Sequence, residues 1–462
     1  MGSWLQRFVH MVMLRLYEIE RNREISITTQ NFSPANTLIE FAELAKTPLF
    51  VERLHAEVLG QLNVLTSPSN TDKPSNHEQL HPSAKRNNGR AYVSATYLPR
   101  LNEVLLQLRL GRFPQKMNTS RILTTEINPQ IREILRKSTG SMARGAEVTL
   151  ALLPMYMPCV YVEGYKPLFE TSKPWKSKRH PKVIFTANRH LYDDVFNFWT
   201  ALAVESGSRL VVAQHGGNYG ISEFPSFAEN HESLVADRYI TWGWKTEGPT
   251  YRGFALPLIG RRLHSSRSND SLLVITDQLW KYPRSIFSDM PESSTYLDHL
   301  KSTMNGLQPE IRHNALLRIH HAHQDAASSQ IDWWKLHSPD IKQDLGDVNF
   351  KTRLNESRLV LIAHNGTSIP EAIALNAPTI ITWSDSYMKV RKSAETVFDA
   401  LEAAGVFHRT PESAASFINL IWNDVDGWWN SPATIEARKQ FTDQYARTVP
   451  NPVRFLTKAL QF

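Results

Sequence analysis

The sequence contains a single cysteine, Cys159, among its 462 residues. One thiol excludes a disulfide within the chain and fits a reducing compartment. No run is apolar for long enough to span a membrane, since residues 149–162 are nearly uncharged but too few and include two prolines. The apolar residues 8–16 contain a histidine and an arginine and precede no small-residue cleavage site, so we expect no signal peptide. The protein is predicted to be cytoplasmic, with peripheral contact at the inner membrane as a further option.

Metal-binding patterns and internal repeats are also lacking. The sequence has no cluster of cysteines, no H-E-x-x-H motif and no D-x-D motif at the end of a predicted strand. A metallohydrolase is the alternative from a different enzyme class, and its candidate ligands, which follow no recognised spacing, are His190, Asp193, Asp194, His215 and His231. We therefore expect neither a metal nor a cofactor.

Length and charge narrow the class of protein further. A chain of 462 residues exceeds what one hydrophobic core usually serves, so two domains are expected. The apolar content of 41% and the charged content of 21% are typical of globular proteins. A net charge of +7 favours anionic partners, but the basic residues are dispersed, which argues against a nucleic-acid groove.

The middle of the chain alternates between predicted strands and helices. Residues 183–186 and 210–213 are predicted strands on either side of a helix over 193–206, which predicts a parallel sheet. A second series of strands is predicted over 272–275, 316–320 and 358–363. The segment 260–270 is rich in Arg, Ser and His and is the predicted linker. We place an N-terminal domain at 1–264, a C-terminal domain at 265–430, and a helix at 431–462 that packs back on the first domain.

A glycine-rich loop follows the second of these strands. The apolar residues 210–213 end in Gln214, His215, Gly216 and Gly217. In open α/β sheets, ligands bind at the carboxyl ends of the strands. Residues 237–244, which begin with a lone acid and end with Gly between two tryptophans, form a second unit close by. Each part alone is explained by a turn or a core position, but together they predict one pocket.

A second small-residue loop occurs in the C-terminal half. It follows the strand over 358–363, and its proposed ligand contacts are Asn365, Gly366, Thr367, Ser368 and Glu371. A helix predicted to start at residue 368 would present hydroxyls and unpaired backbone N–H groups to an anion. The alternatives are simple N-capping by a hydroxyl and, for Glu371, a favourable position in the first turn of a helix.

Two parallel sheets joined by a linker, with an anion site in the second, predict an α/β protein of the GT-B glycosyltransferase type. The sequence resembles the bacterial surface-polysaccharide transferase group that includes the retaining β-Kdo glycosyltransferases. The segments that carry the resemblance are 152–168, 188–205, 214–220, 231–232, 236–239 and 241–244. Among them, QHGG followed by DRY-x-x-WGW is fairly specific, whereas the loop over 364–378 is generic to GT-B enzymes.

The resemblance implies transfer of 3-deoxy-manno-octulosonic acid (Kdo) from CMP-β-Kdo with retention of configuration. Such a reaction uses a carboxylate nucleophile, and Asp237 matches the family's nucleophile. Glu163 matches a second acidic position and is the candidate that activates the acceptor, with a simple turn as its equal alternative. His215 completes the predicted catalytic set. The predicted donor-binding residues in addition to the C-terminal loop are Gln214, Gly216, Gly217, Arg238, Lys281, Arg284 and His320.

These expectations define a function and its partners. The expected activity lies in lipopolysaccharide O-antigen or capsule biosynthesis, with a CMP-sugar donor and a lipid-linked or oligosaccharide acceptor. A transferase that uses another CMP-, UDP- or GDP-sugar is the nearest alternative. The non-enzymatic alternative is a protein of the envelope machinery that binds a sugar but does not turn it over.

Overall fold

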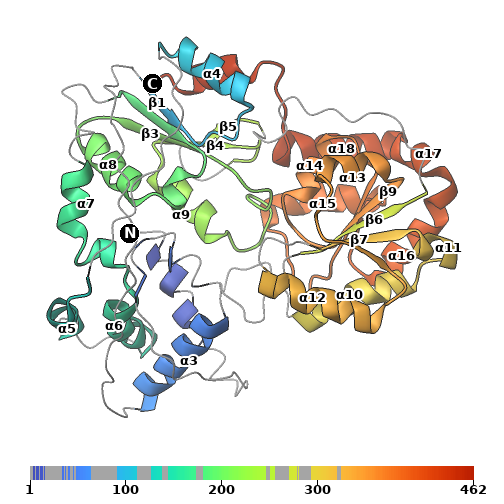
Figure 1. The fold of residues 1–462 in the computed structure, drawn as a ribbon. Helices are drawn as coiled ribbons and strands as arrows, with labels where there is room; N and C mark the ends of the chain where they lie inside the picture. The colour runs from blue at the N-terminus through green and yellow to red at the C-terminus, as the bar shows by residue number, and fades with distance from the viewer. Residues whose placement is uncertain are drawn as a thin grey trace.

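The strands form two separate sheets in a computed structural model of the chain (Figure 1). The residues that the structure describes are 4, 5, 7–9, 11–13, 15, 34, 35, 37, 40, 41, 45, 48–63, 91–111, 126–137, 144–172, 181–245, 250–254, 270–277, 279, 293–319 and 324–462. The predicted linker over 260–270 lies outside the described residues, apart from residue 270.

The N-terminal sheet is parallel throughout and has the strand order β1-β2-β3-β4-β5. Its strands are β1 (Ala91–Ser94), β2 (Val183–Thr186), β3 (Arg209–Ala213), β4 (Arg238–Thr241) and β5 (Thr250–Arg252). All four residues of β2 are buried, as expected of a strand covered on both faces. Val183 and Phe185 pack towards α4 (Arg100–Arg109) and α19 (Pro452–Ala459), whereas Ile184 packs towards α8 (Asp194–Glu205).

Further helices adjoin this sheet. Helix α7 (Tyr165–Ser172) packs on α8, and α9 (Phe227–Val235) packs against β3 and β4. The side chain of Asp193 caps α8 by accepting a hydrogen bond of 2.8 Å from the amide of Phe196, so this acid starts the helix as predicted. A separate helical layer contains α3 (Pro48–Asn63), α5 (Pro129–Lys137) and α6 (Arg144–Tyr156), with an aromatic core that includes Trp4 and Phe50 (Figure 1).

The C-terminal sheet is also parallel and has the strand order β11-β10-β9-β6-β7-β8. Its strands are β6 (Leu272–Ile275), β7 (Ala315–Arg318), β8 (Lys342–Asp344), β9 (Leu359–Ile362), β10 (Thr379–Thr382) and β11 (Phe407–His408). One face is covered by α10 (Ser293–Asn305), α12 (Gln324–His337) and α16 (Pro411–Ile421). The opposite face is covered by α13 (Phe350–Glu356), α14 (Ser368–Ala374), α15 (Lys392–Ala403) and α18 (Pro432–Tyr445). Two short helices, α11 (Pro309–His313) and α17 (Val425–Trp429), complete this half.

The two halves share one hydrophobic core. A single cluster of buried residues contains Tyr239, Trp242 and Trp244 from the N-terminal half together with Ile275 and Ile362 from the C-terminal sheet. The described parts of the two halves are therefore packed together rather than merely tethered.

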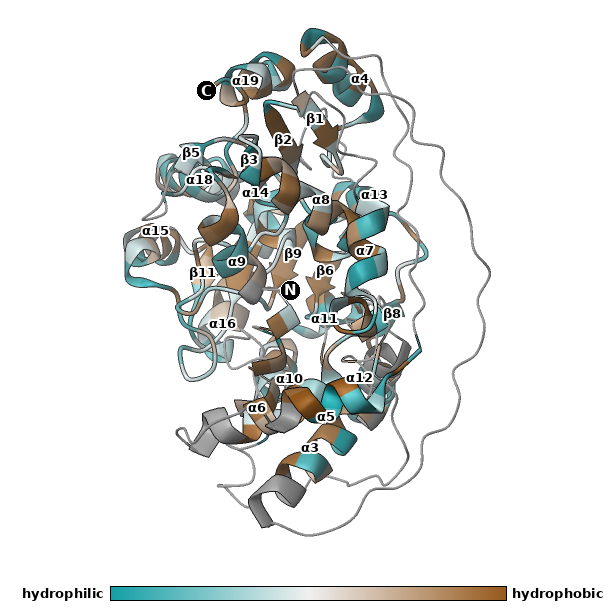
Figure 2. Ribbon diagram, turned by 90° about the vertical axis from the view of Figure 1, so that its left-hand side faces the viewer, coloured by the Kyte–Doolittle hydropathy of each residue, from teal (hydrophilic) through white to brown (hydrophobic). Residues whose placement is uncertain are grey.

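The end of the chain crosses from one half to the other. Helix α18 packs on α14 and α15, and then the amide of Arg447 donates to the carbonyl of Trp242 at 2.9 Å. Helix α19 packs beside α4, where Val453 and Leu456 enter the core of the N-terminal sheet (Figure 2).

These observations confirm the predicted fold class, because two parallel α/β sheets set against each other are the arrangement of a GT-B protein. The first strand, β1, ends at Ser94, because Ala95 and Tyr97 have positive φ angles of 50° and 58° that end the extended backbone. None of the described helices has the length and the hydropathy that a membrane crossing requires.

Candidate functional site

Three strands of the N-terminal sheet end at the same edge. Because β1, β2 and β3 are parallel, the residues that follow them, Tyr97, His190 and His215, gather there. This is the edge at which open α/β sheets bind ligands.

Gln214 fixes the glycine loop. Its side chain is fully buried, and its Oε1 accepts hydrogen bonds of 2.8 Å from the amide of Trp242 and from the indole nitrogen of Trp244. Its Nε2 donates to the carbonyl of Gly216 at 2.7 Å. The prediction that Gln214 contacts the donor needs correction, because these bonds hold its amide inside the protein.

His215 lies against a buried carboxylate. Its Nδ1 is 3.3 Å from Oε1 of Glu232, and the same oxygen is 3.1 Å from Nε2 of His190. The other oxygen of Glu232 accepts a hydrogen bond of 3.0 Å from the hydroxyl of Tyr239. Glu232 is fully buried, whereas the His215 side chain remains 16% exposed. The arrangement orients an imidazole that can still reach a ligand.

Burial opposes ionisation of Glu232, but the two neighbouring histidines outweigh it and hold the pKa of its carboxyl below the usual range. The carboxylate is therefore charged at neutral pH. His231, beside His190, is different because burial and then His190 lower its pKa to about 4. His231 is therefore uncharged at neutral pH.

Two tyrosines surround the His215 ring. The ring of Tyr97 is nearly parallel to it, with an interplanar angle of 5° and centroids 6.3 Å apart. Tyr219 meets it edge-on at 5.5 Å, and the Tyr219 hydroxyl is 3.4 Å from Nε2 of His215. These contacts restrict the imidazole to one orientation.

The loop over 364–368 in the C-terminal half touches the glycine loop. The amide of Gly217 donates to Oγ1 of Thr367 at 3.1 Å, and Nδ2 of Asn365 donates to Oγ of Ser222 at 2.9 Å. A Cβ on Gly217 would overlap with the backbone of Thr367, including a distance of 2.8 Å to the Thr367 nitrogen. The predicted loops of the two halves therefore meet directly, and Gly217 is required by close approach.

Thr367 precedes α14 but does not cap it through its side chain. Its hydroxyl accepts from Gly217 instead, so the simple N-capping alternative does not describe this residue. The backbone amide of Glu371 donates to the Thr367 carbonyl at 3.1 Å, and the Glu371 side chain is partly buried in the first turn of α14.

An ion pair also links the two halves near this loop. The guanidinium of Arg391 lies 2.8 Å from Oε1 of Glu229, whose other oxygen accepts from the amide of Gly220 at 3.2 Å. Nε of Arg391 donates to the carbonyl of Ser222 at 2.9 Å. The segment between the glycine loop and α9 is thus held from both sides.

The C-terminal loop presents polar groups of its own. Nε2 of His364 lies 2.9 Å from Oγ of Ser368, and burial lowers the pKa of His364. A Cβ on Gly366 would lie 2.7 Å from the His364 ring, so glycine is needed here as well. Oδ1 of Asn365 is buried without a hydrogen-bond partner in the described part of the chain. A buried acceptor of this kind is suited to a ligand hydroxyl or amide.

Asp237 does not join this site. It precedes β4 and pairs beside Leu210 at the amino edge of the sheet, roughly 13 Å along the strand direction from Gln214 at about 3.3 Å per residue. Its carboxylate accepts hydrogen bonds of 2.8 Å from Arg209 and from the Leu210 amide. The prediction that Asp237 shares a pocket with the glycine loop is therefore wrong.

Arg238 is directed towards the end of the chain. It donates to the carbonyl groups of Ala459 and Gln461, and its guanidinium lies 4.1 Å from the centroid of the Phe462 ring. The predicted role in donor binding is corrected, because these contacts secure the chain beyond α19.

Glu163 is engaged in the helical layer. Both of its oxygens accept from Arg132, at 2.7 and 2.8 Å, and its side chain is 4% exposed. Burial would raise the pKa of Glu163, but Arg132 and the amide of Asn128 hold it below the usual range. A carboxylate paired in this way is a poor candidate for a general base.

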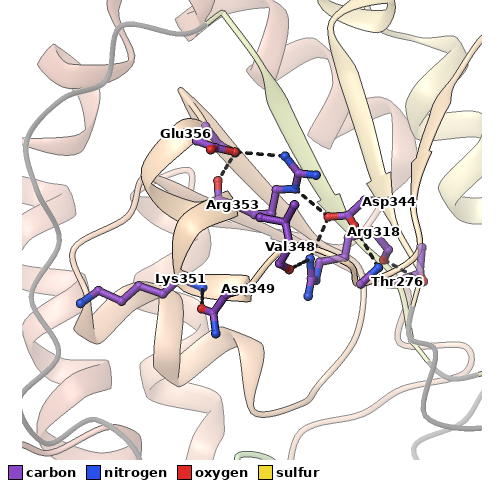
Figure 3. A network of polar contacts seen from close by, with 10 residues as sticks. Thr276, Arg318, Asp344, Val348, Asn349, Lys351, Arg353 and Glu356 are labelled. Atoms are coloured by element: carbon purple, nitrogen blue, oxygen red, sulfur yellow. Dashed lines mark hydrogen bonds and ion pairs between the residues drawn. The ribbon is translucent and has the colours of Figure 1, made fainter.

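A polar network organises the ends of β7 and β8 in the C-terminal sheet (Figure 3). Oδ2 of Asp344 accepts from Arg318 at 2.7 Å and from Arg353 at 2.9 Å. Arg318 also donates to the carbonyl of Val348 at 2.9 Å. The guanidinium of Arg318, at the end of β7, is thus bound to Asp344.

Three predicted donor contacts, Lys281, Arg284 and His320, lie outside the described residues. Within the described ranges, no group of three His, Cys, Asp or Glu side chains is arranged to hold a metal ion.

The sequence did not point to Glu232, Tyr97 or His364 as site residues, and it pointed to His190 only as a candidate metal ligand. One pattern in the sequence could have identified Glu232. It lies four residues after Ala228 and four before Ala236, a spacing that places all three on one face of a helix, and that face is buried. His190 and His364 each follow a predicted strand by a few residues, as His215 does.

Several solved structures resemble this fold distantly. TarM has a TM-score of 0.42 at 9% identity, and the match covers 63% of this chain and 57% of TarM. HepE from Anabaena, in complex with UDP-glucose, has a TM-score of 0.41 at 12% identity over 80% of this chain and 97% of its own. WaaG, a glycosyltransferase involved in lipopolysaccharide biosynthesis, has a TM-score of 0.35 at 11% identity, and the match covers 80% of this chain and 98% of WaaG.

No curated protein is similar enough in sequence to count as a relative. A family profile does match, and it extends over residues 1–460, nearly the whole chain. The protein therefore belongs to the LIC12162 family of transferases.

Proposed function

We propose that the protein is a glycosyltransferase that moves a sugar from a nucleotide donor to a hydroxyl group of a glycan, with His215 as the general base. The observation that carries this proposal is the contact of 3.3 Å between His215 and the fully buried Glu232, at the edge where the two halves meet. A transferase of this kind needs a group that accepts the proton of the acceptor hydroxyl.

The chemical step follows from this arrangement. The acceptor oxygen gives its proton to Nε2 of His215 and forms a bond to the anomeric carbon of the donor sugar. The bond between that carbon and the nucleotide oxygen breaks, and the nucleotide leaves with the electron pair. Glu232 holds the imidazole in place through Nδ1 and stabilises its positive charge.

The loop over 364–368 supplies the donor side in this proposal. The unpartnered Oδ1 of Asn365 would accept a hydrogen bond from the donor, and Gly366 and Ser368 lie on either side of the contact between Thr367 and Gly217. These positions retain the donor-binding role expected from the sequence, together with Gly216 and Glu371.

We further propose that the transferred sugar is Kdo and that the donor is CMP-β-Kdo. The support for Kdo is the resemblance of segments 214–220, 236–239 and 241–244 to the β-Kdo transferases. The acceptor would be a lipid-linked or free oligosaccharide of a lipopolysaccharide O-antigen or capsule, reached by peripheral contact with the inner membrane. The covalent step through Asp237 that this resemblance implies is not carried into the proposal, because Asp237 lies at the opposite edge of the sheet.

Release of free nucleotide in the presence of an oligosaccharide acceptor tests the proposal. CMP-Kdo, UDP-glucose and GDP-mannose are compared as donors with the unaltered protein and with His215→Ala. His313→Ala, which changes an exposed histidine in α11, is the matched control. We expect release from CMP-Kdo that is lost in His215→Ala and retained in His313→Ala.

Other outcomes separate the parts of the proposal. Turnover of a UDP- or GDP-sugar alone would reject Kdo but keep the glycosyltransferase. Equal turnover by His215→Ala would reject the general base. If no donor is turned over and neither CMP, UDP nor GDP raises the unfolding temperature, the glycosyltransferase itself is rejected.

A further inference from the structure

We propose that the ring of Tyr97 is the surface on which a sugar ring of the acceptor stacks, an inference that rests on the proposed function. Tyr97 follows β1 at the ligand-binding edge, and its ring lies parallel to that of His215. Tyr97 is 46% exposed as a residue, although its neighbours Ala95 and Leu98 are at least partly buried. An exposed aromatic face beside the general base is suited to an amphipathic ring.

The backbone around Tyr97 is held in an unfavourable conformation. Ala95 and Tyr97 both lie in the left-handed region, and Asn376 is the only other non-glycine residue of the described chain that does so. A left-handed backbone conformation costs free energy in any residue with a Cβ. Such a conformation is kept only where the surrounding structure imposes it, and this is often the case at ligand sites. The chain therefore accepts strain on both sides of Thr96.

Neighbouring contacts impose this turn. The carbonyl of Ala95 accepts a hydrogen bond of 2.9 Å from the amide of Ala187, which follows β2. The hydroxyl of Thr96 donates to Glu103 of α4 at 2.9 Å and accepts from the amide of Leu98 at 3.2 Å. The turn is anchored to the sheet and to a helix, so the position of the ring is set by the fold.

The ring itself is also oriented. Nδ2 of Asn188 donates to the Tyr97 hydroxyl at 2.8 Å, which fixes the far end of the side chain. A tyrosine held at both ends loses little conformational entropy when a ligand covers its face. The C–H face of a pyranose ring is the sugar surface that packs on such a ring, while its hydroxyl groups stay available to the imidazole.

Position favours the acceptor over the donor as the occupant. The C-terminal half contacts the site through Gly217, Ser222 and Glu229, and all three residues come after His215 in the chain. Tyr97 follows β1, which is separated from β3 by β2 in the sheet. A sugar on Tyr97 would therefore lie nearer to the end of β1, whereas the loop over 364–368 touches residues that follow β3.

Ligand-observed saturation-transfer NMR tests this inference without knowledge of the natural acceptor. The probes are the methyl pyranosides of glucose, galactose, mannose and N-acetylglucosamine, added to the full-length protein. Tyr97→Ala removes the ring and Tyr97→Phe keeps it. Tyr165→Ala is the matched control, because Tyr165 is a tyrosine of similar exposure, 51%, in α7.

We expect transfer to the ring protons of at least one pyranoside with the unaltered protein, Tyr97→Phe and Tyr165→Ala, and its loss with Tyr97→Ala. Binding that is equal in Tyr97→Ala, or absent from the unaltered protein, would overturn the inference. Donor turnover measured on the same samples separates the two proposals. Turnover without pyranoside binding rejects only the role of Tyr97, whereas binding through Tyr97 without turnover rejects the glycosyltransferase.

Discussion

Nδ1 of His215 lies 3.3 Å from Oε1 of Glu232, and this contact joins the end of β3 to the buried face of α9. The carboxylate has no exposure of its own, so it acts on a ligand only through the imidazole. Glu232 is therefore a positioning residue whose loss should change the behaviour of His215.

Glu232→Gln should lower kcat roughly 100-fold, the usual contribution of an assisted general base, and leave KM for the donor little changed. The amide keeps the shape of the side chain but removes the charge that stabilises protonated His215. Steady-state kinetics with the preferred donor measures the effect, and Glu310→Gln in α11 is the exposed control. A kcat for Glu232→Gln equal to that of the control would mean that the carboxylate has only a structural role.

Asp237→Asn should retain transfer activity, because this carboxylate is paired with Arg209 at the amino edge of the sheet. We expect kcat within about twofold of the unaltered protein, as for surface pairs of small energetic value. Intact-mass spectrometry after incubation with CMP-Kdo provides a second readout. A sugar adduct on the unaltered protein that Asp237→Asn lacks would restore Asp237 as the nucleophile.

The positions of Asp237 and His215 also show what could be predicted from the sequence. Strands β2 and β6 were predicted with the observed bounds because four consecutive apolar residues are buried on both faces of a sheet. The ligand-binding edge followed from residues that come after a strand. Asp237 comes before a strand, and in a parallel sheet the residues that precede a strand lie at the opposite edge from those that follow one. The sequence alone therefore argued against placing Asp237 in the pocket of the glycine loop.

Other features depend on tertiary contacts that no local pattern reveals. Glu232 becomes a site residue because His190 and His215 arrive from two different strands. The strained turn at Tyr97 contains no glycine and no sequence signal for a positive φ. The pairing of Arg318 with Asp344 likewise joins two strands whose adjacency is a property of the sheet order.

Gly217→Ala should lower the unfolding temperature, because the added Cβ overlaps with the backbone of Thr367 and the two halves must separate to admit it. Gly216→Ala is the matched comparison, since its Cβ would approach no closer than 3.2 Å, to the ring of Tyr219. We expect a loss of several degrees for Gly217→Ala and a smaller one for Gly216→Ala, measured by differential scanning calorimetry. Equal losses would show that Thr367 moves aside easily.

Asp344→Asn should destabilise the fold by about 3 kcal/mol at neutral pH, because it leaves two arginines facing a neutral group in a buried site. Burial opposes the charge on Asp344, but the Gly346 amide and the two arginines hold its pKa below the unfolded value. Its contribution is therefore present above the unfolded pKa, about 3.9, and is lost as the pH falls through the lower folded pKa.

Urea denaturation at pH 7 and at pH 3 measures this difference in the free energy of unfolding. The difference between Asp344→Asn and the unaltered protein should narrow at the lower pH. Asp340→Asn is the control, because Asp340 pairs with Arg312 but is 53% exposed and should cost less than about 1 kcal/mol. If the difference in the free energy of unfolding between Asp344→Asn and the unaltered protein is the same at both pH values, packing and not charge accounts for the destabilisation.

The hydrophobic core shared by Trp242, Trp244 and the C-terminal sheet limits how this chain can be recombined. A C-terminal half taken from a relative would meet an apolar surface shaped for another partner, and α18 and α19 would bring the end of the chain back onto a foreign sheet. Chimeras that exchange the C-terminal half would therefore have to carry the segment with Trp242 and Trp244 and the last two helices along with the C-terminal sheet. Either half produced alone would expose this surface and would be expected to aggregate.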